Sequence, residues 1–226
     1  MKFNRIYIPI LDFIVIFGRL LRQSENKTPF QNWQKVILIY IPQTFFIFWL
    51  FSLIPIFGTL SYALVFIPLS AWLHIKIKKI KRKNDIIAVF LLYFVVIHIG
   101  FGGIWSFIGH TFLADSIATG IGWPTGSPFQ TELAFYSLGF GIAGIIAIWL
   151  RGHMITALII SKSIFWYGAA FVHIKEAIIN NNYSPLNIGM PLIGDIVLPT
   201  ILLTLLAILL KNEIKNKEKK GLFTLP

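Results

Sequence analysis

Long apolar stretches, separated by short polar segments, dominate the pattern of this chain. Six of them approach the roughly 20 residues that a helix needs to cross a bilayer core of about 30 Å. We therefore predict spanning helices at residues 36–57, 59–75, 86–107, 133–150, 154–173 and 190–210. Residues 6–20 form a shorter apolar stretch with charge at both ends, so we expect an interfacial helix there and leave open whether it spans.

The expected fold class is an all-α, polytopic membrane helical bundle of about six transmembrane helices. Composition agrees, because 56% of the residues are hydrophobic, 13% are charged and the mean hydropathy is +0.75. We divide the chain by composition into an interfacial segment, an accessory hairpin with a basic loop, a four-helix functional bundle and a basic tail, at residues 1–35, 36–84, 85–210 and 211–226.

Positive charge is unevenly distributed over the predicted loops. Lys and Arg, which give a net charge of +11, concentrate before the first span and after the second, fourth and sixth. Six spans place all these segments on one side of the membrane, so the positive-inside rule puts both termini in the cytoplasm. We expect the protein to lie in the inner (cytoplasmic) membrane of the cell. We expect the bilayer, with anionic lipids at the cytoplasmic face, as its partner. Nucleic-acid binding is excluded because no basic stretch lies on a soluble module.

Ionisable side chains within or beside spans are costly to keep in an apolar medium, so each is a candidate for a functional site. In the predicted orientation they gather near the extracytoplasmic ends of the last four spans, where Trp123, Ser127 and Asn187 also lie. The predicted polar cluster consists of His110, Asp115, Glu132, His173 and Asp195. For His110, Asp115 and Glu132, a solvated position among lipid headgroups is the alternative.

The predicted fifth span carries a polar stripe along one helical face. Steps of four, three, four and three residues connect Lys162, Trp166, Ala169, His173 and Glu176. We expect this face to point into the bundle, except that Lys162 extends to the cytoplasmic surface, about 12 Å away along the helix.

Two local patterns concern helix packing and the loop between the third and fourth predicted spans. Leu113, Ile117 and Ile121 predict a short amphipathic helix that ends at the following Gly and Pro residues. Small residues in the fourth span allow close helix approach, and these are Gly139, Gly141, Ala143 and Gly144.

The same segments resemble an uncharacterised family of small prokaryotic integral membrane proteins, known as a domain of unknown function. The resemblance covers about residues 86–210. Its motifs are Gly109-His110-x-Phe112-x-x-Asp115-x-x-Ala118, Ile121-Gly122-Trp123-Pro124-x-Gly126-Ser127-Pro128-Phe129-Gln130-x-Glu132, Gly168-x-Ala170-x-x-His173-Ile174, Asn187-x-Gly189 and Asp195-Ile196. This resemblance implies no particular activity.

Three functions stay open, and we favour a non-enzymatic role. The first is transport or permeation of a proton, a cation or a small polar solute through the predicted cluster, with a homo-oligomer left open because six spans are few for a carrier. The second is a membrane-embedded metal site or metalloenzyme built from His110, Glu132, His173 and Asp195. The third is a non-catalytic membrane partner. Haem ligation fits poorly, because His98 and His173 differ in depth by roughly 9 Å on ideal helices.

Overall fold

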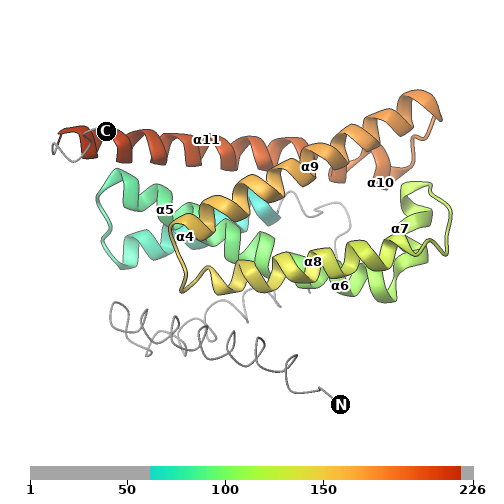
Figure 1. The fold of residues 1–226 in the computed structure, drawn as a ribbon, viewed down its shortest axis with the longest axis horizontal. Coiled ribbons are helices and arrows are strands. Elements are labelled where there is room, and N and C mark those ends of the chain that lie inside the picture. The colour runs from blue at the N-terminus through green and yellow to red at the C-terminus, as the bar shows by residue number, and fades with distance from the viewer. Residues whose placement is uncertain (1–61, 220–226) are drawn as a thin grey trace, which may run out of the picture. The chain divides into compact units, whose positions relative to one another are not determined.

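The computed structural model describes residues 62–219, which form helices joined by short turns (Figure 1). The predicted interfacial segment 1–35, the predicted span 36–57 and the end of the predicted basic tail, residues 220–226, lie outside the described residues. Within them the predicted all-helical class is confirmed, because no residue from 62 to 219 is in a strand.

The first described elements form a helical hairpin. A π-helical turn η2 (Tyr62–Phe66) continues directly into α4 (Ile67–Ile77), and α5 (Lys83–Tyr93) follows after a short turn. The two helices are joined by a hydrogen bond of 2.9 Å between His74 Nδ1 and the Tyr93 hydroxyl. In the turn, Arg82 donates two hydrogen bonds to the Asp85 carboxylate, and these bonds raise the pKa of Arg82 further above its ordinary value.

Helix α5 belongs to one long helix that contains a π-helical segment. It continues through η3 (Phe94–Phe101) into α6 (Gly102–Phe112), so that the helix runs without a break from Lys83 to Phe112. The wider winding is visible where the Gly102 amide donates to the Ile97 carbonyl, five residues earlier. π-helical segments are rare and frequently mark functional sites. Hydropathy predicts the apolar helix but not this change in winding.

The second half of the described chain contains five helices, namely α7 (Ala114–Ile121), α8 (Phe129–Ile146), α9 (His153–Ile179), α10 (Pro185–Ile188) and α11 (Met190–Lys219). The short amphipathic helix predicted between the third and fourth spans is confirmed as α7. Helix α8 ends earlier than predicted because residues 147–150, although apolar, form a turn. Helices α9 and α11 extend beyond the predicted ends of the apolar runs. Polar side chains there do not interrupt the backbone hydrogen bonds, so the helix continues after the apolar run stops.

Four helical stretches are long and apolar enough to cross a membrane, namely Lys83–Phe112, Phe129–Ile146, His153–Ile179 and Pro185–Asn216. A shorter apolar helix covers Ala63–Ile77. The pattern of apolar residues therefore correctly located the long helices of residues 83–216.

Glycines bring α8 against the long helix formed by η3 and α6. A Cβ atom on Gly144 would lie 2.7 Å from the Gly100 Cα, and one on Gly103 would lie 2.6 Å from the Ser137 carbonyl oxygen. No side chain fits at these two positions without moving a backbone. The predicted close approach at Gly141 and Gly144 is confirmed, whereas a Cβ on Gly139 would meet nothing within 4 Å.

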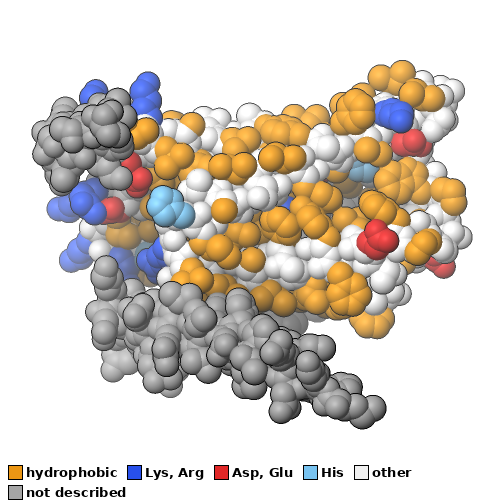
Figure 2. Space-filling model, in the orientation of Figure 1, with side chains coloured by type: hydrophobic (Ala, Val, Ile, Leu, Met, Phe, Trp, Pro, Cys, Tyr) orange, Lys and Arg blue, Asp and Glu red, His pale blue; other side chains and the backbone are white. Residues whose placement is uncertain are grey.

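On the surface, charged side chains gather at the two ends of the bundle, with a broad apolar surface between them (Figure 2). One end, which we call the basic end, contains the α4–α5 turn, the α8–α9 turn with Arg151, and the last turns of α11 (Figure 1). Asn212 donates a hydrogen bond of 3.0 Å to Asn84 there. The other end, the polar end, contains α7 and α10. This distribution matches that of a bundle with an apolar girdle.

Candidate functional site

His173 is the most constrained polar side chain of the polar end. It lies on α9 and is 8% exposed, and its Nδ1 is 2.7 Å from Oδ1 of Asn187 on α10. Asn187 is fully buried, and its Nδ2 donates to the backbone carbonyls of His173 (3.1 Å) and Asn182 (2.8 Å). Because both amide hydrogens are used, Oδ1 must accept, and His173 Nδ1 therefore carries a hydrogen. Nε2 is the ring nitrogen that gains or loses a proton.

Asp195 of α11 faces this second nitrogen. His173 Nε2 is 3.9 Å from Asp195 Oδ2, too far for a direct hydrogen bond but close enough for an ion pair when the imidazole is protonated. The indole of Trp123 stacks on the imidazole, with ring centroids 6.3 Å apart and planes inclined by 17°. We call Trp123, His173, Asn187 and Asp195 the His173 centre.

Local backbone geometry explains how Trp123 reaches this position. Helix α7 ends at Gly122 with φ of +81°, a left-handed conformation that favours glycine, and the Trp123 amide then donates to the Ala118 carbonyl. A Cβ on Gly122 would also collide with Ser184 and Asn182. Asn182 Nδ2 donates to the Ile121 carbonyl at 2.8 Å, which joins the end of α7 to the segment leading into α10.

Pro199 alters the backbone beside the Asp195 carboxylate. Proline has no N–H, so Pro199 cannot donate the helical hydrogen bond that the Asp195 carbonyl, four residues earlier, would otherwise receive. A carboxylate and a backbone carbonyl without its usual helical donor therefore belong to the same residue. Both are suitable partners for a water molecule or a cation.

Lys162 lies deeper in α9 and is only 7% exposed. Its Nζ is 4.3 Å from the ring centroid of Phe165, and the rings of Tyr136, Phe140 and Trp166 lie at 5.0, 5.5 and 5.6 Å. The prediction that this side chain reaches the cytoplasmic surface is wrong, because aromatic faces from α8 and α9 surround the ammonium within the bundle and attract it electrostatically. The charges of Lys162 and Asp195 also attract each other.

The Trp166 ring connects Lys162 to His98 of the π-helical segment η3. The rings of His98 and Trp166 have centroids 5.3 Å apart and planes inclined by 35°. Lys162, Trp166 and His173 of the predicted polar stripe are all buried. A series of ionisable groups thus leads from the middle of the long helix to the polar end, and we call His98, Lys162, Asp195 and His173 the polar column.

The remaining predicted site residues have other surroundings. His110 Nδ1 lies 2.5 Å from Oε1 of Gln130, a buried side chain at the start of α8. Asp115 is exposed and accepts a hydrogen bond of 2.9 Å from the Gly126 amide, which closes the α7–α8 loop. Ser127 and Glu132 are exposed. In residues 62–219 no hydrogen bond or ion pair connects these groups directly to the His173 centre.

Metal ligation by His110, Glu132, His173 and Asp195 is the second function that the sequence leaves open. In the part of the chain that the structure describes, no three His, Cys, Asp or Glu side chains are arranged to hold a metal ion. His173 and Asp195 come together, whereas His110 pairs with Gln130 and Glu132 is exposed.

Sequence reasoning missed two side chains that organise the polar end, Gln130 and Asn182. Both are neutral amides, which a search for ionisable groups passes over. Gln130 is the second residue of the apolar helix α8, and Asn182 lies in the Asn-rich loop after α9. A buried amide in such a place can satisfy several backbone or side-chain groups at once.

These features define an all-helical protein with four helices able to cross a membrane and a buried polar centre near one end of the bundle. The chain belongs to the Family of unknown function (DUF6790), whose model matches residues 57–215. The match begins well before residue 86, where the resemblance seen in the sequence starts, so it includes α4 and the basic α4–α5 turn. No curated protein and no solved structure matches the chain.

Proposed function

We propose that this protein mediates transport or permeation of a proton, a cation or a small polar solute, and that the His173 centre is the exchange site. The observation that carries this proposal is the distance of 3.9 Å between His173 Nε2 and Asp195 Oδ2, which belong to two ionisable side chains that face each other in a largely buried place. Paired ionisable groups within apolar bundles are typical of ion and proton pathways.

The hydrogen bond to Asn187 determines which proton can move. Since Nδ1–H is committed to the Asn187 carbonyl oxygen, a proton that arrives at the neutral imidazole binds Nε2, next to the Asp195 carboxylate. The proton leaves from the same nitrogen, either to Asp195 or to a water between the two groups. Asn187 thus has a positioning role: it keeps the imidazole oriented while the other ring nitrogen exchanges its proton.

Lys162 supplies a positive charge deeper in the column. A buried ammonium is costly in a medium of low dielectric, and the Asp195 carboxylate compensates part of that cost. A proton or cation that binds at Asp195 weakens this compensation. Occupancy of the outer site and the energy of the Lys162 charge are therefore coupled.

The distribution of charge supports an orientation as well. With six spans and the basic end in the cytoplasm, the polar end faces the extracytoplasmic side of the inner membrane, and the His173 centre lies near that side. Both termini are then cytoplasmic. A membrane-impermeant reagent that labels cysteines introduced at Ser127 and Lys79 from opposite sides would test this orientation.

Proton efflux from acid-loaded proteoliposomes tests the function directly. We expect Asp195→Asn and His173→Gln each to lower the flux of an acid-loaded vesicle by about 100-fold, the usual contribution of a positioned proton-transfer group. Glu213→Gln, which removes an exposed carboxylate from the same helix α11, is the matched control and should leave flux unchanged.

The result depends on properly folded variants. Each variant should keep the helical circular dichroism spectrum and the gel-filtration profile of the unaltered protein. Equal proton, cation and solute flux in folded Asp195→Asn, His173→Gln and the control would contradict the proposal.

A further inference from the structure

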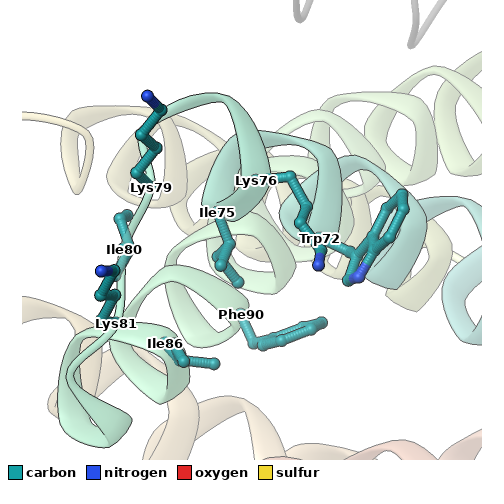
Figure 3. A pocket seen from close by; sticks show the side chains of 8 residues that line it. All are labelled: Trp72, Ile75, Lys76, Lys79, Ile80, Lys81, Ile86 and Phe90. Carbon is teal, nitrogen blue, oxygen red and sulfur yellow. The ribbon is translucent and has the colours of Figure 1, made fainter.

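A hollow of about 460 Å³ opens at the basic end, between α4, the α4–α5 turn and α5. This volume lies within the range of about 300–1,000 Å³ that is usual for sites of small molecules. Eight residues line it, as Figure 3 shows: Trp72, Ile75, Lys76, Lys79, Ile80, Lys81, Ile86 and Phe90. They come from both helices of the hairpin, so the turn between the helices shapes the hollow.

The lining combines two chemistries. Three of the residues are exposed lysines, and none of the eight is acidic. The other five are apolar or aromatic, including Ile75, which is 8% exposed, and Phe90, which is half-buried. The hollow therefore offers positive charge next to a hydrophobic wall.

Asp85, close to the hollow in sequence, is already paired with another basic residue. The acidic residue closest in sequence, Asp85, is held by two hydrogen bonds to Arg82, at 2.7 and 2.8 Å. Lys76 Nζ lies 5.5 Å from the ring centroid of Trp72, a cation–π distance that leaves the ammonium available to an anion as well. Trp72 itself is 47% exposed, as expected of an aromatic side chain at a membrane–water boundary.

We propose that this hollow binds the headgroup of an anionic phospholipid, with the lysines on the phosphate and the first part of the acyl chains against Trp72 and Phe90. Charge complementarity and the apolar wall argue for this occupant, since a free phosphate ion would have no use for the wall. The position agrees as well, because the hollow lies at the basic end, where the apolar helices α4 and α5 meet the lysine-rich turn between them. The lipid site is independent of the proposed proton exchange at the other end.

Native mass spectrometry of the full chain, purified and delipidated in detergent, tests this inference. Phosphatidylglycerol and phosphatidylcholine with identical acyl chains are the probes, and inorganic phosphate in excess is the competitor. We expect the unaltered protein to retain phosphatidylglycerol in preference to phosphatidylcholine. The triple variant Lys76→Gln/Lys79→Gln/Lys81→Gln should bind phosphatidylglycerol about 100-fold more weakly, at about five-fold for each lysine.

A matched triple variant separates this site from general electrostatic attraction. Lys78→Gln/Lys83→Gln/Lys211→Gln removes the same charge from exposed lysines of the basic end that do not line the hollow. It should lower the affinity by no more than about three-fold at physiological salt, because exposed charges away from the ligand are screened. All six positions are exposed, so both variants should fold, which an unchanged thermal unfolding midpoint would verify.

Three results would overturn the inference. The first is an equal loss of phosphatidylglycerol in the two triple variants, which would mean attraction without a site. The second is equal retention of the two lipids by the unaltered protein. The third is complete displacement of the lipid by inorganic phosphate, which would identify an anion site that does not select lipid.

Discussion

Replacement of Asn187 by alanine should destabilise the protein far more than its size suggests. The side chain is fully buried and makes hydrogen bonds with His173 Nδ1 and with the carbonyls of His173 and Asn182. Alanine leaves two buried groups of His173 and the part-buried Asn182 carbonyl without this partner. Each such loss costs at least about 1 kcal/mol, and up to about 3 kcal/mol where water does not replace the partner.

The expected total is therefore about 3–5 kcal/mol, since three losses of about 1 kcal/mol form the lower limit and a small cavity adds to them. For a chain of 150–250 residues, this corresponds to a fall in the unfolding midpoint of very roughly 10 °C. Thermal unfolding in detergent, followed by circular dichroism or by the fluorescence of a buried reporter, measures this change.

Asn180→Ala is the matched control. The Asn180 side chain also makes two hydrogen bonds, each 3.0 Å long, to the Glu176 carboxylate, but it is exposed. Water replaces the lost partner there, so we expect a change below about 1 kcal/mol. If Asn187→Ala unfolds at the same temperature as Asn180→Ala, the argument that the buried amide network organises the polar end is wrong.

Three further predictions concern packing, charge and the exposed carboxylate. Gly144→Ala should destabilise the bundle by about 1–3 kcal/mol because the added methyl group collides with the backbone of η3. Gly139→Ala, where the methyl group meets nothing, should be neutral or slightly stabilising, and the thermal unfolding midpoints of the two variants test this difference. Lys162→Met should lower the free energy of unfolding by about 2 kcal/mol, because it leaves the Asp195 carboxylate without the compensating charge of the ammonium. Adding Asp195→Asn should recover most of that loss, and a double variant less stable than either single variant would contradict the coupling. Glu132→Gln should retain proton flux in proteoliposomes, since this carboxylate is exposed.

The long helices could be predicted from the sequence because one property, the length of an apolar run, determines whether a segment can cross a bilayer. Their ends could not. Residues 147–150 are as apolar as the helix before them, yet they form a turn, because hydropathy does not show where backbone hydrogen bonds stop. The π-helical winding of η3 is equally invisible to hydropathy, since its residues are uniformly apolar apart from His98 and Gly100.

The candidate site, too, could be predicted from the sequence only in part. Helical periodicity correctly places Trp166 and His173 on one buried face of α9, because that pattern depends on one helix alone. Lys162 lies on the same face, but the expectation that its side chain reaches the cytoplasmic surface is wrong. The partners of these residues depend on how several helices are rotated about their axes. Periodicity gives no such information, so the aromatic rings around Lys162 and the Gln130 partner of His110 had to come from the structure.

The charge balance of the polar column limits how the proposed exchange can work. With Lys162 positive, Asp195 negative and both His98 and His173 neutral, the four groups of the polar column together carry no net charge, which is the least costly state in a medium of low dielectric. One added proton makes the column positive by one unit and is favourable only if a counter-ion enters, water reaches the site, or the Lys162 proton leaves. The column should therefore not act as a passive proton wire. Uptake at His173 must be coupled to another ion or to a movement that admits water, and the separation of α11 from α9 beside Asp195 would be such a movement.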